Sequence, residues 1–472
     1  LDAATAQIRP LPDNAGSWLS VSTSATTAGN IGLNFLRESP VNARVGSYLD
    51  SWDLQGEVGL EVRLGIALNN TELENDIQVL AIPKGGSLYI PEYDLRFNGL
   101  RGPINFSVAD GLQATGLSAN LFDFPVAARI TSNDKGVVIT GNGRVSNTAL
   151  QDWSLQPEFV KNLLQFSEGA LAYRADLTIY NQEQADGTLS SLSLSSDLLG
   201  LAFDLPQPFD KGIDESASLD LDMNFSAGLE HITVNFRDQL NADLIIEASE
   251  LYGGEINFGA RNQDFSIRRL NSETGLLISG EISDFNLQEW QEVSQAFSAE
   301  EGESAAELVR LVDVRIGNLV VFGVDLPAIN TVLRRQGPAW ALYLDNEQIQ
   351  GDMLFPDAAN EALDVQLSYL RIPADEEEVD VTDPEVETLT GSIEIRSEEE
   401  VDVLADINPA DLPAMNFHTD EFSLGAGNMG AWDFQLRSNN NGALISNLTM
   451  RTAGASITDL SGETGATIDW QF

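Results

Sequence analysis

The chain has 472 residues, no cysteine and a formal net charge of −48, from 73 acidic and 25 basic residues. Nucleic-acid backbones and anionic lipid surfaces are bound mainly through lysine and arginine, so this charge argues against both as partners. The lack of cysteine excludes disulfides, thiolate metal sites and cysteine nucleophiles, but it does not identify a compartment. Hydrophobic residues make up 43% of the chain, which is enough for a folded core.

The two ends of the sequence indicate a piece of a longer protein. The chain begins with Leu1 rather than Met and ends in a strand-like segment, 468–472. No apolar run approaches the roughly 18 residues of a membrane-spanning helix, and no basic-then-apolar signal peptide is present.

The N-terminal part of the chain is expected to be strand and loop, followed by a short helix. Residues 1–34 are polar and rich in serine and threonine. Ser39 then has the character of a helix N-cap, and Pro40 suits the first helical turn, which predicts a helix near 39–50. From residue 54 to residue 64 apolar residues alternate with polar ones, which is typical of a strand.

The segment 84–145 predicts an antiparallel meander with one continuous apolar face. Ile104, Phe106 and Val108 alternate with Asn105 and Ser107. Successive side chains of a strand leave opposite faces of a sheet, so this alternation gives one apolar and one polar face. Asp-Gly and similar pairs between the strands supply the backbone conformations of tight hairpins.

The rest of the chain continues this pattern, with two further predicted helices. Helical spacing of apolar residues predicts helices near 153–166 and 284–311. Between them, the strand 219–225 is expected to pair with 232–236 across a turn at residues 227–228. The strongly acidic segment 375–387 is interpreted as a solvated loop, since its spacing fits no EF-hand.

A search for catalytic and cofactor motifs is negative. The two histidines, His231 and His418, stand alone in strand patterns, whereas zinc needs a cluster of ligands. Gly425–Gly430 matches GxGxxG, but alternating residues follow it rather than a helix, which predicts a hairpin turn that binds neither NAD nor FAD. We therefore expect no enzyme activity, no catalytic residue, no metal and no cofactor.

The amount of one-faced sheet leaves two architectures open. About one strand per 13 residues gives roughly 30 to 35 strands, and an unbroken sheet of this size would extend about 150 Å at about 4.8 Å per strand. Such a sheet must twist, curl or fold over. The apolar faces could pair into several β-sandwiches, which the residues alone favour, or line a groove for acyl chains.

Several stretches of the chain contain motifs that resemble those of a known protein family. Residues 84–106 resemble the unit in which a strand is followed by Leu-x-Gly-x-hydrophobic-x-Phe, and 117–125 is similar to the next unit. Residues 197–211 are similar to the family motif in which a strand leads into Leu-Pro-x-Pro-hydrophobic-x-Lys. Residues 422–470 resemble its repeated glycine and tryptophan block. In order and spacing these motifs cover most of the chain. The chain therefore resembles a middle-to-late fragment of the AsmA-like YhdP family of Gram-negative envelope proteins.

The resemblance implies a mainly β fold, a long antiparallel β-sheet curled into an elongated trough with a few short helices. It implies one groove segment, 1–472, with approximate sub-segments 1–151, 152–283 and 284–472. The implied role is transport of phospholipid between the inner and outer membranes, across the periplasm, by a protein anchored in the inner membrane. The family's anchor helix and its C-terminal portion are absent from this chain, and the acidic 375–387 segment is not a family feature.

The alternating strands supply the wall residues expected to contact lipid. An ordinary sandwich core is the alternative role for the same side chains, within a periplasmic or extracellular scaffold of stacked β-sandwiches that binds protein. The expected groove-lining residues are Ile104, Phe106, Val108, Leu117, Leu221, Met223, Phe225, Val234 and Phe236.

Overall fold

A computed structural model describes residues 3–12, 16–38, 51–69, 73, 75–154, 156, 158–226, 228–247, 250–259, 275–296, 308–321, 324–337, 339–356, 361–372, 412–439, 442–452, 454–457 and 466–471. The predicted helix near 39–50 and the acidic segment 375–387 lie outside these residues.

The described strands number 28 and belong to one hydrogen-bonded sheet. By internal contacts the chain divides into two compact units: Leu1–Leu276 with Gln295–Leu308, and Leu277–Ser294 with Val309–Phe472. A stacked sandwich needs separate sheets that face each other. The single sheet therefore confirms the predicted mainly β groove fold rather than a row of sandwiches.

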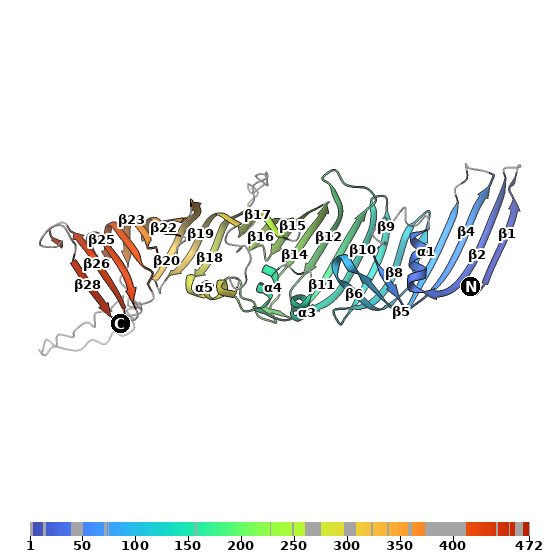
Figure 1. The fold of residues 1–472 in the computed structure, drawn as a ribbon, viewed down its shortest axis with the longest axis horizontal. Helices are drawn as coiled ribbons and strands as arrows, with labels where there is room; N and C mark the ends of the chain where they lie inside the picture. The colour runs from blue at the N-terminus through green and yellow to red at the C-terminus, as the bar shows by residue number, and fades with distance from the viewer. Residues whose placement is uncertain are drawn as a thin grey trace, which may run out of the picture. The chain divides into compact units, whose positions relative to one another are not determined.

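Strands of the first unit lie side by side largely in chain order (Figure 1). Most neighbours are antiparallel and joined by short turns, as expected for a meander. The strands are β1 (Ala3–Pro10), β2 (Ser17–Ala28), β3 (Asp53–Gln55), β4 (Glu57–Leu68), β5 (Asp76–Ile90), β6 (Leu95–Arg101), β7 (Ile104–Ser107), β8 (Gly111–Leu121), β9 (Phe124–Asn133), β10 (Gly136–Ser146), β11 (Ser167–Tyr180), β12 (Thr188–Ser196), β13 (Leu201–Phe203), β14 (Leu219–Ser226), β15 (Leu229–Phe236), β16 (Leu240–Glu247) and β17 (Glu250–Phe258).

The long strand β5 interrupts the simple meander. Its first half pairs with β4 and β7, and its second half pairs with β3 and β6. β6 and β7 both pair with β8 as well, so these two short strands together fill the space between β5 and β8. A 3-10 turn, η3 (Pro91–Tyr93), joins β5 to β6.

The predicted pairing of β14 with β15 is confirmed. Leu219 lies opposite Phe236, and Met223 lies opposite Ile232. Gly228 in the turn has a φ of +88°, a backbone conformation that favours glycine.

The helix α1 (Gly29–Arg37) corrects the prediction of strand and loop for residues 1–34. Its residue Leu33 is only 5% exposed and packs against Val62, Val79 and Phe106 on the sheet. Tertiary packing of this kind overrides the weak local preference of a segment rich in threonine and alanine.

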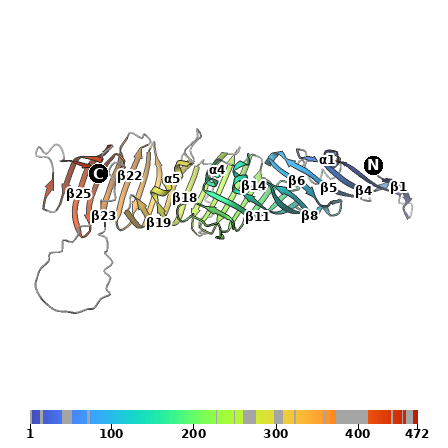
Figure 2. The same ribbon diagram turned by 90° about the horizontal axis from the view of Figure 1, so that it is seen from below.

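Two short helices replace the single helix predicted near 153–166. α3 (Asn147–Asp152) begins earlier, because the Ser146 hydroxyl accepts a hydrogen bond from the Ala149 amide at 3.2 Å and caps the helix. α4 (Glu158–Leu164) follows, and both ribbon views place it against the strands around β11 and β14 (Figures 1 and 2).

The third predicted helix, 284–311, is also shorter in the structure. β18 (Gly275–Asn286) occupies its start, α5 (Leu287–Ala296) its middle, and a strand has begun by Val309. The described α-helices have 9, 6, 7 and 10 residues. In the described part of the chain none of the helices has the length and apolar character needed to cross a membrane.

The second unit is also a succession of strands, and one pairing among its described residues departs from the antiparallel pattern. β23 and β24, which flank the undescribed segment 373–411, pair in parallel. The remaining strands are β19 (Val309–Val321), β20 (Val324–Gln336), β21 (Ala339–Asp345), β22 (Ile349–Pro356), β23 (Leu363–Ile372), β24 (Met415–Leu424), β25 (Gly427–Asn439), β26 (Gly442–Arg451), β27 (Ser456–Ile457) and β28 (Ala466–Gln471).

Candidate functional site: the apolar face of the sheet

The strand register sorts the side chains of the first unit into two opposite faces. Residues directly opposite each other on paired strands point to the same face, so a row can be followed across the sheet. One row, which defines the apolar face of the first unit, runs from β9 to β16 through Ile130, Ile139, Leu177, Leu192, Met223, Ile232 and Leu244.

The neighbouring row lies on the other side of the sheet and is polar. Hydrogen bonds join its members, for example from Thr140 to Asp176 and from Ser193 to Asp222. The row consists of Arg129, Thr140, Asp176, Ser193, Asp222, Thr233, Asp243 and Glu255. The sheet is therefore apolar on one face and water-compatible on the other from β9 to β16.

The register places eight of the nine predicted groove-lining residues on the apolar face. Val108 follows the end of β7, where its amide donates a hydrogen bond to the Ile77 carbonyl at 3.2 Å. The eight residues on the apolar face are Ile104, Phe106, Leu117, Leu221, Met223, Phe225, Val234 and Phe236.

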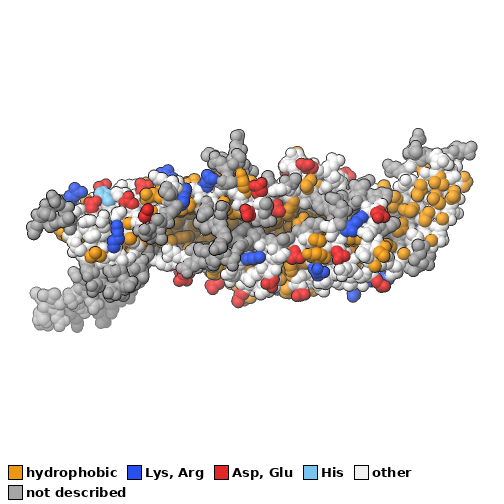
Figure 3. All heavy atoms as spheres, in the orientation of Figure 1, with side chains coloured by type: hydrophobic (Ala, Val, Ile, Leu, Met, Phe, Trp, Pro, Cys, Tyr) orange, Lys and Arg blue, Asp and Glu red, His pale blue; other side chains and the backbone are white. Residues whose placement is uncertain are grey.

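Exposure along this face is uneven. Phe106 is 4% exposed and Leu117 8%, because both belong to well-packed clusters of β4 to β10. In contrast, Leu221, Met223 and Val234 on β14 and β15 are only half-buried. At the N-terminal strands β1, β2 and β4 hydrophobic side chains gather on the visible surface (Figure 3), and Ile8 is 62% exposed. Apolar surface thus remains open at both β1–β4 and β14–β15.

A contact between distant strands shows that the sheet of the first unit curls. The rings of Tyr93 and Phe225 lie edge to face, with centroids 6.2 Å apart. β6, which follows Tyr93, and β14, which carries Phe225, are six strand-to-strand steps apart, or about 29 Å in a flat sheet at about 4.8 Å per step. Because Phe225 lies on the apolar face, the η3 turn reaches over that face.

The η3 turn is held there by the segment after α3. Trp153 Nε1 donates a hydrogen bond to the Tyr93 carbonyl at 2.8 Å, and the Ser154 hydroxyl donates one to Asp94 at 2.6 Å. Trp153 also packs edge to face against Phe122 in the turn between β8 and β9. These contacts form a strap, residues 91–94 with 153–154, over part of the apolar face. Sequence periodicity did not identify it, since its residues lie in turns.

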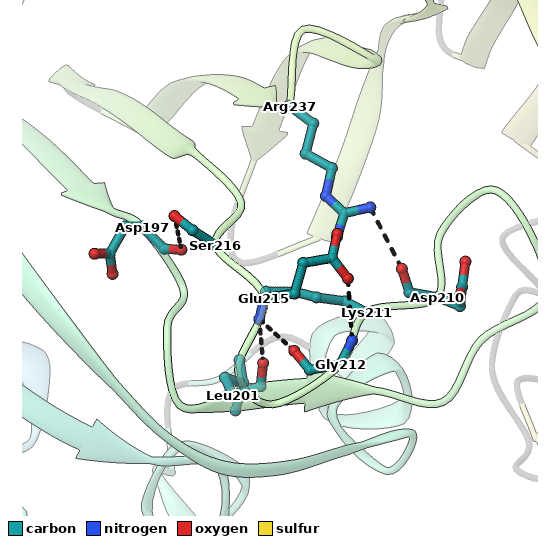
Figure 4. A network of polar contacts seen from close by, with 8 residues as sticks. All are labelled: Asp197, Leu201, Asp210, Lys211, Gly212, Glu215, Ser216 and Arg237. Carbon is teal, nitrogen blue, oxygen red and sulfur yellow. Dashed lines mark hydrogen bonds and ion pairs between the residues drawn. The ribbon is translucent and has the colours of Figure 1, made fainter.

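A buried lysine, Lys211, anchors a second segment that covers the apolar face, residues 197–215. Lys211 is 2% exposed, and its ammonium donates hydrogen bonds to the carbonyls of Leu201 at 2.6 Å and Gly212 at 3.1 Å (Figure 4). Burial lowers its pKa, since the charged form is partly desolvated. Nearby, Arg237 forms an ion pair with Glu215 at 2.8 Å, which ties this segment to the end of β15.

The anchored segment packs on the apolar face. Leu198 and Leu201 are 2% and 1% exposed, and they form one cluster with Val145 and Leu171 of β10 and β11. Lys211 is the lysine of the motif 197–211, so this motif builds a cover over the ends of the strands.

The second unit has its own apolar face, built in the same way. The Phe417 and Phe434 rings stack with centroids 4.7 Å apart and planes 20° from parallel. Its apolar row consists of Leu333, Leu342, Met353, Val365, Phe417 and Phe434. Its polar row consists of Tyr343, Asp352, Gln366, His418, Asp433 and Thr449.

Both histidines lie on the polar faces and are paired with carboxylates. His231 contacts Asp243, and His418 lies 2.6 Å from Asp433. The hydrogen bond that each histidine ring donates to its carboxylate raises the pKa of that histidine. No group of three or more histidine, aspartate or glutamate side chains suited to a metal occurs within the described ranges.

The GxGxxG segment is a hairpin turn, as predicted. β24 ends at Leu424, β25 begins at Gly427, and these two residues lie opposite each other. The helix that a dinucleotide site requires is therefore replaced by a strand.

Comparison with known protein families gives a match over nearly the whole chain. Neither a curated protein nor a solved structure matches the chain. The family model described as YhdP protein matches residues 1–471, which is nearly the whole sequence. The chain therefore belongs to the YhdP protein family.

Proposed function

We propose that this chain carries phospholipid between the inner and outer membranes of a Gram-negative envelope, with the acyl chains lying along its apolar face. The observation that carries the proposal is the unbroken apolar row across β9 to β16, backed by a polar row on the opposite side. Membership of the YhdP family supports a role in the cell envelope. We place the chain in the periplasm as one groove segment of a longer, membrane-anchored protein.

The physical chemistry of the face suits passage rather than tight storage. Each buried methylene group contributes about 0.8 kcal/mol, so an acyl chain is stabilised by any continuous apolar wall. Since the wall residues of β14 and β15 are similar in kind, successive positions offer similar stabilisation. Transport of this kind needs no catalytic residue, and we propose no enzyme activity and no metal or cofactor.

The alternative is a scaffold that binds protein. It would use the same apolar residues as a dry core or as a contact surface for a protein partner. Half-buried side chains at Leu221, Met223 and Val234 argue against the dry core, which would bury them fully. The strap and the Lys211 segment favour the same conclusion, since they cover the face in places instead of pairing it with a second sheet.

The first test is the lipid content of the purified chain. Mass spectrometry of an organic extract should identify phospholipid at a reproducible molar ratio to the protein. A scaffold would yield a lipid-free extract under the same purification.

The second test places a carboxylate on each face of one strand. Met223→Asp puts the charge on the apolar face of β14, where water at the open side can solvate it, so the full-length protein should fold but lose lipid movement. Asn224→Asp puts the same group one residue away on the polar face and should leave transport unchanged. If both variants transport lipid equally well, the apolar face is not the lipid path.

A further inference from the structure

One carboxylate interrupts the apolar face of the first unit. By the alternation of β15, Glu230 lies on the same side as Ile232, Val234 and Phe236, opposite Phe225 on β14. Its other neighbour in the register is Ile246 on β16, which is 5% exposed. Tyrosines aside, Glu230 is the only residue with an acidic or basic side chain along the described rows of this face from β8 to β17.

The Glu230 carboxylate has no partner among the described residues. No hydrogen bond or ion pair to its side chain occurs there, and burial against its apolar neighbours raises its pKa. A half-buried carboxylate without a partner is unfavourable, and a cation beside it would relieve that cost.

The Phe225 ring lies beside this carboxylate, and the Tyr93 ring packs against the Phe225 ring. Directly opposite residues on antiparallel strands have Cβ atoms about 5 Å apart, which places the Phe225 side chain next to that of Glu230. The Tyr93 ring lies 6.2 Å from the Phe225 ring, at an interplanar angle of 62°. Ring faces attract organic ammonium ions, and a neighbouring carboxylate adds charge attraction.

We propose that Glu230, Phe225 and Tyr93 form a binding site for the ammonium group of an amine-bearing phospholipid. The position suits a head group, since Glu230 stands two residues from the exposed Gly228 of the hairpin turn, while the apolar face beyond it takes the acyl chains. The inference rests on the proposed lipid-carrying function and adds a head-group preference to it. The strap that carries Tyr93 makes this position differ from the rest of the wall.

The test compares two short-chain phospholipids with identical acyl chains, one with an ethanolamine and one with a glycerol head group. Calorimetry with the full chain, below the micelle concentration, should give about five- to tenfold tighter binding of the ethanolamine lipid. Glu230→Gln should abolish this preference, and Phe225→Leu should reduce it. The matched control Glu247→Gln removes an exposed carboxylate at the end of β16 and should retain the preference.

The outcomes separate the site from the function. Equal binding of both lipids to the wild-type chain, unchanged in Glu230→Gln, would overturn the ammonium site but leave groove binding intact. Binding of neither lipid would overturn the proposed function as well. A third titration uses free ethanolamine in place of the lipid. If free ethanolamine binds as tightly as the ethanolamine phospholipid, the site does not recognise a lipid head group and the assignment is overturned. Circular dichroism of each variant confirms that lost preference is not lost folding.

Discussion

Replacing Phe106 by alanine should destabilise the first unit strongly. Phe106 is 4% exposed and packs against Leu33, Val62 and Val79. An aromatic side chain buries about 200 Å², which at about 25 cal/mol per Å² contributes about 5 kcal/mol. Alanine retains part of this contribution and leaves a cavity, so we expect Phe106→Ala to lower the free energy of unfolding by about 4 kcal/mol.

The measurement is hydrogen exchange of the amides in β4, β5 and β7 over a urea series, which reports the stability of this region separately from the rest of the chain. Asn105→Ala is the control, because Asn105 is the exposed neighbour on the opposite face and its loss should change stability by less than about 0.5 kcal/mol. Equal effects of the two substitutions, or a loss below about 1 kcal/mol for Phe106→Ala, would refute the assignment of the two faces.

Two further predictions concern other parts of the chain. Asp433 raises the pKa of His418 above its ordinary 6.5, so the folded state holds this proton more tightly than the unfolded state. The resulting stabilisation is complete below about pH 6.5 and is lost as the pH rises through the folded-state pKa. His418→Gln should therefore flatten the fall in stability above pH 6.5, and an NMR titration with His418 at or below its ordinary pKa would contradict this. Gly430 has a φ of +77°, and a Cβ there would lie 2.0 Å from the Arg451 carbonyl oxygen. Gly430→Ala should therefore lower the free energy of unfolding, measured in urea, by about 1–3 kcal/mol. Gly427 has no such φ, and Gly427→Ala should cost less than about 1 kcal/mol; the opposite ranking would contradict the hairpin account.

The sequence predicted the strands well where apolar and polar residues alternate strictly. In β14 and β15 the alternation identified both strands, their pairing and the apolar side, because a period of two is fixed by the backbone geometry of a strand. The same argument recognised the Gly425–Gly430 hairpin, since alternation resumes directly after it.

Helices and long-range pairings were harder to predict. α1 forms because Leu33 packs on a sheet that includes strands more than 60 residues later in the chain, and no local pattern carries that information. The parallel pairing of β23 with β24 depends on the path of the intervening chain, which alternation does not encode. The Tyr93 strap likewise depends on the curl of the sheet.

One missed residue did have a signal in the sequence. Glu230 is in phase with Ile232, Val234 and Phe236, so the alternation that predicted the apolar face also placed a carboxylate on it. The predicted groove-lining residues are all apolar, so they did not include Glu230.

The most direct test of lipid on the apolar face is photocrosslinking at two adjacent positions of β12. A photoreactive residue in place of Leu192, on the apolar face, should form phospholipid adducts in cells, detected by mass spectrometry of the purified chain. The same residue in place of Ser193, on the polar face, should form none. Adducts of equal yield at both positions, or at neither, would contradict the account.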